Sequence, residues 1–173
     1  MSTDRTILLL RHAKSAWGLD VDDHERPLSG RGRRDSTAVG ELLAARRVVP
    51  DLVWCSTAVR ARQTWQGAVE AGAAAGRLIC HTELYEALAH ELLRVLRRTP
   101  SEVRTVMLIG HAPAVPELVE QLAQRVGNED LWRQLDTKFP TSGLATLGYR
   151  GRWPDLGQQS ATLLDFAVPR GRS

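Results

Sequence analysis

Imidazole, guanidinium and hydroxyl groups follow three apolar runs of this sequence, at the point where each run ends. A neutral imidazole can attack phosphorus, and guanidinium groups bind the oxygens of a phosphoryl group. Together these groups predict a site for phosphoryl chemistry. They are Arg11-His12-Ala13-Lys14-Ser15 after residues 6–10, Ser56-Thr57 and Arg60 after residues 51–55, and Gly110-His111-Ala112-Pro113 after residues 104–109.

Other kinds of phosphate or metal chemistry fit the sequence less well. Two histidines with no nearby carboxylate or cysteine cluster give poor spacing for zinc, and converging arginines would repel a cation. Neither Cys55 nor Cys80 lies in a glycine-rich, arginine-containing loop, and a Walker-type phosphate loop is absent. Both cysteines follow apolar residues and are interpreted as small buried side chains. We therefore expect a histidine nucleophile that needs no metal and no cofactor.

The elements that must position these residues alternate between strand and helix patterns. Apolar runs predict strands over 6–10, 51–55, 77–80, 104–109, 143–149 and 161–166, and apolar stripes predict helices over 31–46, 58–72, 88–97 and 114–126. This alternation predicts an α/β fold: a three-layer α/β/α sandwich with a mostly parallel central sheet, in one domain over residues 1–173. Ligands of such sheets bind beyond the carboxyl ends of the strands, where all three groups lie. Free N–H groups at the helix that starts near Ala112 favour an anion, so Ala112 is a candidate for substrate binding.

Length and charge restrict the classes of partner. The chain has 173 residues and a formal net charge of +3, and 21 of its 23 basic residues are arginine. That charge is too small to predict nucleic-acid binding. No run approaches the length of about 18 apolar residues that a membrane span needs, and no signal peptide is recognised, so we expect a cytoplasmic protein without membrane contact. The expected partner is a phosphorylated protein or a small phosphorylated metabolite, and the oligomeric state is left open.

Several motifs resemble those of a known family. The sequence is similar to the histidine phosphatase (phosphoglycerate mutase-like) superfamily, and in particular to its small bacterial SixA-type phosphohistidine phosphatases. The similarity covers nearly the whole chain in the right order. It rests on Arg-His-Ala-Lys-Ser-Ala-Trp at 11–17, Asp-His-Glu-Arg-Pro-Leu at 23–28, Ser-Thr-Ala-Val-Arg-Ala-Arg-Gln-Thr at 56–64, Glu-Leu-Tyr-Glu-Ala at 83–87, and Phe-Pro-Thr-Ser at 139–142.

The resemblance implies roles for four residues. His12 would be the phosphorylated nucleophile, and Arg11 would bind the phosphoryl group. Arg60 would be the second clamp, because it is the first arginine of the pattern Arg-Ala-x-x-Thr. Arg62 would then point elsewhere, since residues two apart on a helix face different ways. His111 would hydrogen-bond the phosphoryl oxygens.

Three further residues have two interpretations each. Ser15 could donate its hydroxyl to the same oxygens, or it could belong to a turn or a helix cap. Glu86 fits the carboxylate that protonates the leaving group in larger members of the superfamily, with Glu83 as the second candidate, or it is a surface residue. His24 is interpreted as an exposed loop histidine, with a place on the rim of the site as the alternative.

The activity that the resemblance implies is hydrolysis of a phosphorylated substrate, protein phosphohistidine in the first place, through a covalent phospho-His12 intermediate. Two alternatives stay open: a small-molecule phosphomonoesterase that acts on a sugar phosphate or nucleotide, and a phosphate-binding module without catalysis. A mutase is not expected, because the chain has no long insertion that could close over the pocket and exclude water. We therefore expect an open site that admits a side chain of another protein.

Overall fold

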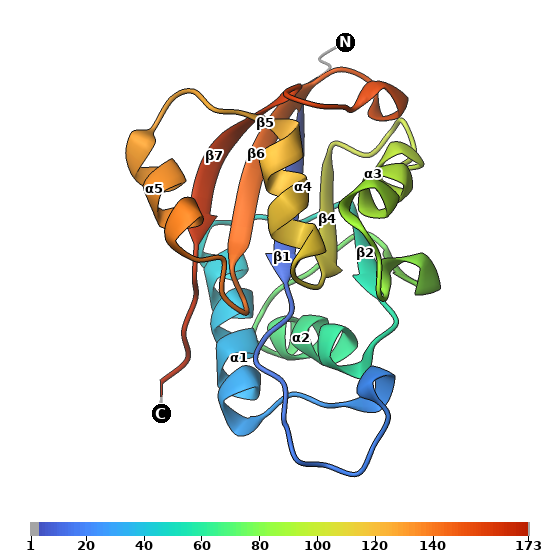
Figure 1. Cartoon of the computed structure of the whole chain (residues 1–173), viewed down its shortest axis with the longest axis vertical. Coiled ribbons are helices and arrows are strands. Elements are labelled where there is room, and N and C mark those ends of the chain that lie inside the picture. Colours follow the sequence, from blue (N-terminus) through green and yellow to red (C-terminus); the bar gives the residue numbers. More distant parts are fainter. Residues whose placement is uncertain (1–3, 173) are drawn as a thin grey trace.

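The computed structural model describes residues 4–172 as a seven-stranded sheet with helices on both faces (Figure 1). The strands are β1 Asp4–Arg11, β2 Leu52–Ser56, β3 Leu78–His81, β4 Thr105–Gly110, β5 Ala123–Gln124, β6 Leu144–Arg150 and β7 Ala161–Ala167. The helices are α1 Gly30–Ala45, α2 Val59–Glu70, α3 Ala89–Arg97, α4 Ala114–Leu122 and α5 Glu129–Thr137, with short 3₁₀ helices η1 Asp23–Glu25, η2 Thr82–Leu84 and η3 Trp153–Asp155. Within this described range, no helix combines the length and the apolar character needed to cross a membrane.

Most strand pairs in the sheet are parallel. The strands lie in the order β3-β2-β4-β1-β6-β7-β5. β1 runs parallel to β4, and β2 runs parallel to both β4 and β3. β6 is antiparallel to β1 and β7, whereas β5 is parallel to β7. The carboxyl ends of β1, β2 and β4 therefore meet at one end of the sheet.

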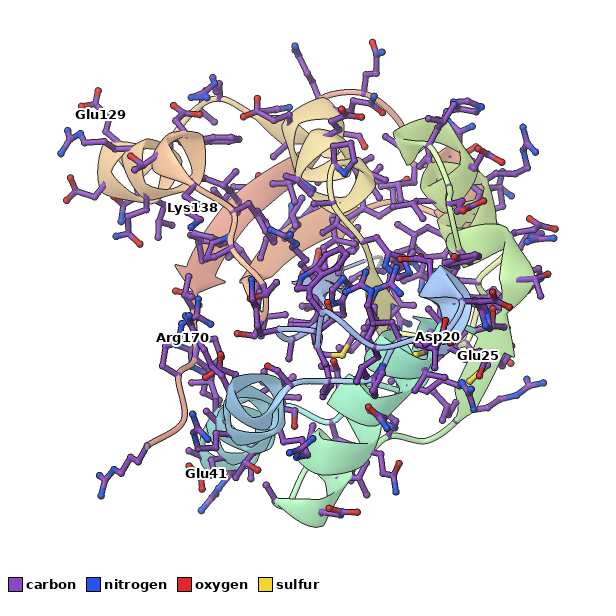
Figure 2. The ribbon with its side chains drawn as sticks, turned by 60° about the horizontal axis from the view of Figure 1, so that its bottom comes forward. Asp20, Glu25, Glu41, Glu129, Lys138 and Arg170 are labelled. Carbon is purple, nitrogen blue, oxygen red and sulfur yellow. The ribbon has the colours of Figure 1, made fainter. Side chains whose placement is uncertain are left out.

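Two apolar layers enclose the sheet. Ile7 and Leu9 of β1 pack on the face covered by α3, α4 and α5, and Leu8 and Leu10 pack on the face covered by α1 and α2. Figure 2 shows this arrangement, with α3, α4 and α5 along the top and α1 and α2 along the bottom. Burial on both faces explains why the strand is continuously apolar rather than alternating. The predicted three-layer α/β fold with a mostly parallel sheet is confirmed.

The register of the strands places the predicted site residues next to one another at one end of the sheet. Arg11 lies opposite Gly110 in the pairing of β1 with β4. One residue further along, the N–H of His12 donates to the carbonyl of Gly110 at 3.0 Å. β2 ends beside them at Ser56. Residues from distant parts of the sequence, among them His12 and His111, therefore leave the sheet as neighbours.

Helix α1 begins against the loop that carries the first histidine. Ser29 caps the helix, because its Oγ accepts a hydrogen bond from the N–H of Gly32. The N–H of Ser29 donates to the carbonyl of Lys14 at 2.9 Å. A Cβ atom at position 32 would lie 1.9 Å from that same carbonyl oxygen. Glycine is therefore required at this position by the close approach of α1 to the loop.

Two expectations from the sequence differ from the structure. The helix predicted over 114–126 ends at Leu122, because residues 123–124 form β5 and pair with β7. Pairing with a sheet edge replaces the last helical turn, which the apolar stripe alone could not indicate. Cys55 is buried as expected, but Cys80 is exposed. Its strand, β3, lies at the edge of the sheet, so fewer elements cover it.

Substitution of Gly32 by alanine is expected to lower the free energy of unfolding by about 2 kcal/mol, because the new methyl group overlaps the Lys14 carbonyl. The matched control is Gly30→Ala in the same helix, where the atom nearest to the added methyl group would be 3.6 Å away, at the end of an arginine side chain. Urea denaturation of both variants measures the difference. Equal stability of the two variants would contradict the proposed close approach.

Candidate active site

His12 directly follows β1 and is almost fully buried, with 8% of its surface exposed. Its Nδ1 lies 2.7 Å from the carbonyl oxygen of Ala13. Because a carbonyl can only accept, Nδ1 carries the proton and donates it. The N–H of Ala13 donates in turn to Oγ1 of Thr64 at 3.0 Å, which ties this loop to α2. Nε2 of His12 therefore keeps its lone pair, as a nucleophile requires.

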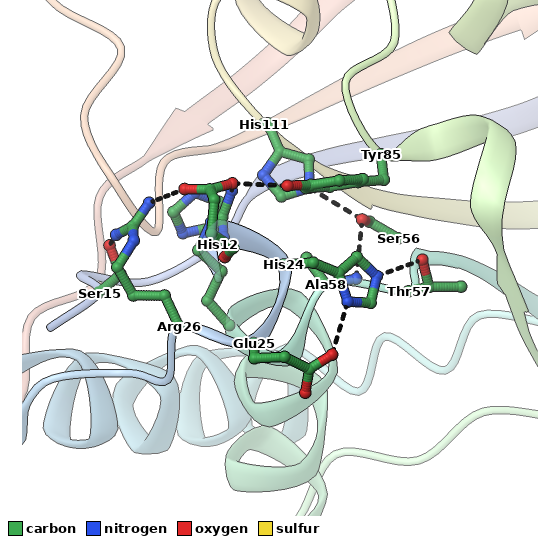
Figure 3. Close-up of polar contacts among 12 residues, drawn as sticks. His12, Ser15, His24, Glu25, Arg26, Ser56, Thr57, Ala58, Tyr85 and His111 are labelled. Carbon is green, nitrogen blue, oxygen red and sulfur yellow. Dashed lines mark hydrogen bonds and ion pairs between the residues drawn. The ribbon is translucent and has the colours of Figure 1, made fainter. Parts of the chain in front are cut away.

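His111 follows β4, and the centroid of its ring lies 5.0 Å from that of His12 (Figure 3). Nε2 of His111 lies 2.8 Å from Oγ of Ser56. That oxygen accepts a hydrogen bond from the N–H of Ala58 at 3.2 Å, so the hydroxyl proton is available for Nε2. With the Ser56 hydroxyl as the donor to Nε2, Nδ1 of His111 carries the ring proton and can donate it to a phosphoryl oxygen.

Two arginines enter the site, one from β1 and one from α2. Arg11 donates from Nη1 to the carbonyl of Phe139 at 2.9 Å. Arg60 has only 6% of its surface exposed. It donates from Nη1 to the carbonyl of Asp23 at 2.7 Å and from Nη2 to the carboxylate of the same residue at 3.0 Å. Arg62, two residues later on α2, is exposed. The helix therefore turns Arg60, and not Arg62, into the site.

Three buried nitrogen atoms of the site have no hydrogen-bond partner: Nε of Arg11, Nε of Arg60 and Nδ1 of His111. Across residues 4–172, no other buried side-chain nitrogen or oxygen is left unpaired. An unpaired buried donor costs about 1–3 kcal/mol, so three in one place indicate a site built for an anionic acceptor. The same range contains no group of three or more histidine, cysteine, aspartate or glutamate side chains placed to hold a metal ion.

Burial and positive charge keep both histidines neutral. Burial lowers the pKa of His12 to about 3, and the charges of His111, Arg60 and Arg11 lower it further, whereas the hydrogen bond to Ala13 opposes the shift. Burial, followed by the charge of Arg60, lowers the pKa of His111 to about 4. A neutral imidazole is the nucleophilic form. His12 is therefore neutral over the whole physiological pH range, as its predicted role as a nucleophile requires.

The segment between β1 and α1 contacts residues of the site. The carboxylate of Asp23 accepts hydrogen bonds from the hydroxyl of Tyr85 at 2.7 Å and from Nη2 of Arg26 at 2.9 Å. Nε2 of His24 lies 2.9 Å from Oγ1 of Thr57, and its ring meets that of Tyr85 edge-on with 4.7 Å between centroids. These contacts tie the segment to the residues of the site, and the expectation of an open site stays a prediction. Figure 3 shows the contact between His24 and Thr57.

The structure places the remaining candidates at the edge of the site. Ser15 is buried, and its hydroxyl accepts a hydrogen bond from Nη1 of Arg26. Ala112 is exposed in the turn between β4 and α4. Glu86 is exposed and, among the residues described, forms no hydrogen bond or ion pair with the site. Glu83 forms an ion pair with Arg98 at 2.9 Å. The roles proposed for Ser15, Ala112 and Glu86 stay predictions.

The sequence analysis assigns no role to three residues that the structure places in the site: Asp23, Ser56 and Tyr85. Asp23 and Arg26 do share one of the family-like motifs, and their spacing of three residues suits an ion pair. Ser56 stands out only as a hydroxyl at a strand end. Tyr85 contacts Asp23 across 62 positions of the chain, so no local pattern could have identified the pair.

The sequence model of the histidine phosphatase superfamily, branch 1, matches residues 7–126 of the chain. The chain belongs to the histidine phosphatase superfamily. The matched range covers more than half of the sequence and includes β1, β2 and β4, whose ends carry the site. The family predicted from the motifs is confirmed, and it supports phosphatase activity.

Similar proteins indicate to which type of histidine phosphatase the chain is related. A solved structure named as a phosphohistidine phosphatase SixA, from Nakamurella multipartitia, is 32% identical with a TM-score of 0.82 over 96% of each chain. Another of that name, from Agrobacterium tumefaciens, is 34% identical with a TM-score of 0.77 over 95% of this chain and 99% of that one. An uncharacterised protein of Mycobacterium tuberculosis is 37% identical over 163 residues, which are 93% of this chain and the whole of that protein. The phosphatase is therefore of the SixA type.

Replacement of Arg60 by alanine is expected to lower kcat/KM for a phosphorylated substrate by about 100- to 1,000-fold, because one buried donor to the transition-state charge is lost. The matched control is Arg62→Ala, which removes the same charge from the exposed side of α2. We expect this control to change kcat/KM by no more than about twofold. Similar losses in both variants would show that long-range charge, and not a contact, is responsible.

Stability is expected to depend on pH through His12. Its pKa is about 3 in the folded protein and about 6.5 in an unfolded chain, so the unfolded state binds more protons between these values. The free energy of unfolding should therefore fall as the pH is lowered from 6.5 towards 4. Urea denaturation at several pH values should give a shallower fall in His12→Asn than in the wild type. The exposed His90, replaced by asparagine, should leave the slope unchanged.

Proposed function

We propose that this phosphatase hydrolyses phosphohistidine on another protein, without a cofactor, through a covalent phosphoryl group on Nε2 of His12. The observation that carries the proposal is the set of three unpaired buried donors beside an unprotonated imidazole nitrogen. Guanidinium and imidazole N–H groups match the oxygens of a phosphoryl group, and their charge is already in place before the reaction. The names of the two SixA structures support the choice of substrate.

In the first step, Nε2 of His12 attacks phosphorus opposite the leaving nitrogen. A new P–N bond forms on His12 while the P–N bond of the substrate breaks, and its electron pair returns to the substrate imidazole. Nδ1 of His12 keeps its proton, held by the carbonyl of Ala13, so the phosphorylated ring carries the positive charge. In the second step water attacks phosphorus, and inorganic phosphate leaves as His12 recovers its lone pair.

A nitrogen leaving group does not depend on a general acid, so the proposal does not require the role predicted for Glu86. Alkoxides need a proton as they depart, whereas an imidazole protonated on its other nitrogen leaves as a neutral molecule. Asp23 is held ionised, since the hydrogen bonds from Tyr85 and Arg26 keep the pKa of its carboxyl well below the usual range. Glu86 is exposed to solvent. Bond exchange between two imidazoles is nearly balanced in energy, because the same kind of bond is broken and formed.

The test is to trap the phosphoryl group on His12. The protein is mixed with a ³²P-labelled phosphohistidine protein, quenched in alkali because phosphohistidine is labile to acid, and digested to locate the label. We expect label on the peptide that contains His12 in the wild type. His12→Asn keeps a donor to Ala13 but lacks the nucleophile, so its kcat should fall by more than about 1,000-fold. His90→Asn serves as the control.

Other outcomes point to the alternatives. Label on His12 from a sugar phosphate or nucleotide, with none from the phosphohistidine protein, would support a small-molecule phosphomonoesterase instead. Binding of phosphate without label or turnover on any substrate would support a module without catalysis. Full activity of His12→Asn would overturn the proposed nucleophile.

A further inference from the structure

Asp23 is joined to the proposed phosphate site by four hydrogen bonds. Its carboxylate accepts from the hydroxyl of Tyr85 at 2.7 Å, from Nη2 of Arg60 at 3.0 Å and from Nη2 of Arg26 at 2.9 Å. Its carbonyl accepts from Nη1 of Arg60 at 2.7 Å. Two of these bonds come from the buried arginine that faces His12. The carboxylate therefore lies directly beside the place where a bound phosphoryl group would meet Arg60.

The same carboxylate remains accessible from the mouth of the site. The side chain of Asp23 is 51% exposed, whereas that of Arg60 is 7% exposed. The rings of Tyr85 and His111 lie edge to face with 5.8 Å between centroids, so the partner of Asp23 packs against the pocket histidine. The carboxylate of Asp23 is therefore a solvent-accessible negative charge that is held beside Arg60 and Tyr85.

A fixed carboxylate at that place discriminates between kinds of leaving group. It repels an oxygen leaving group, which gains negative charge as its bond to phosphorus breaks. It attracts an imidazole that is protonated on the nitrogen away from phosphorus, because that nitrogen carries an N–H donor and a positive charge. Since Asp23 is ionised, it acts as a hydrogen-bond acceptor and not as a proton donor.

We propose that Asp23 is the residue that makes this phosphatase selective for cationic nitrogen leaving groups, by accepting the N–H of the departing imidazole. This inference rests on the proposed function. During the reaction the substrate P–N bond breaks, its electron pair goes to the imidazole nitrogen, and the P–N bond to His12 forms. The distal N–H stays on the imidazole throughout and donates to Asp23. No proton or co-reactant has to be supplied.

The experiment compares two small substrates that have no protein surface. Phosphoimidazole has the nitrogen leaving group, and p-nitrophenyl phosphate has an oxygen leaving group. In Asp23→Asn we expect kcat/KM to fall about 10- to 100-fold for phosphoimidazole, because a charge-assisted hydrogen bond is lost. For p-nitrophenyl phosphate we expect kcat/KM to rise, because a repulsive charge is removed. The ratio of the two values is the readout.

Asp20→Asn is the matched control, since it removes one negative charge from an exposed position of the same segment. It should leave the ratio of the two kcat/KM values unchanged. Asp23→Ala is the second variant, and it should shift the ratio in the same direction as Asp23→Asn. Thermal unfolding of each variant checks that the segment is still folded.

The outcomes separate this inference from the proposed function. Equal losses on both substrates in Asp23→Asn would mean that the carboxylate only holds Arg60 in place, and would overturn the selectivity while leaving the His12 mechanism intact. A wild-type protein that labels His12 from p-nitrophenyl phosphate but does not hydrolyse phosphoimidazole would overturn the proposed substrate and the role of Asp23 together. A shift in the ratio with Asp20→Asn as large as with Asp23→Asn would assign the effect to general charge.

Discussion

Backbone hydrogen bonds between β1 and β4 hold Arg11 opposite Gly110, and the other groups of the site are placed relative to that pairing. β4 also pairs with β2, so the ends of three parallel strands lie side by side. Parallel strands all release their chains at the same end of a sheet, where the exposed backbone and the following side chains converge. Because both residues follow the ends of neighbouring parallel strands, the ring centroids of His12 and His111 lie 5.0 Å apart. The two residues are far apart in the sequence.

Helix α2 positions both Arg60 and the loop that carries His12. Arg60 and Thr64 lie four residues apart and therefore on the same face of this helix. The hydroxyl of Thr64 donates to the carbonyl of Arg60 at 2.7 Å and accepts from the N–H of Ala13 at 3.0 Å. One helical face thus presents a phosphate clamp and also holds the loop whose carbonyl orients His12. A rotation of α2 would disturb both functions at once, which couples binding geometry to nucleophile geometry.

The electrostatics of the site depend on a balance between buried cations and one ionised carboxylate. Two buried or half-buried arginines would make the pocket strongly positive, and that field helps to keep both histidines neutral. Asp23 offsets part of this charge at the mouth, and its hydrogen bonds fix where the compensating charge lies. Burial also raises the pKa of Tyr85 to about 12, and the hydrogen bond to Asp23 acts in the same direction, so the phenol stays a donor.

The sequence by itself determined the strand-and-helix alternation, the family and the positions of His12, Arg11, Arg60 and His111, because each of these follows from a local pattern. Continuous apolar runs, apolar stripes with a period of 3.6 and a histidine directly after a strand are short-range signals. The tertiary structure alone decided the tautomer of His12, which depends on the carbonyl of Ala13, and the contact of His111 with the hydroxyl of Ser56.

The tertiary structure also decided that Asp23 meets Tyr85 and Arg60, that His24 meets Thr57, and that α4 ends early where β5 begins. Each of these is a contact between residues that are far apart in sequence. Such contacts depend on how the elements pack and not on the residue types along any one stretch of chain, so no local pattern could contain them.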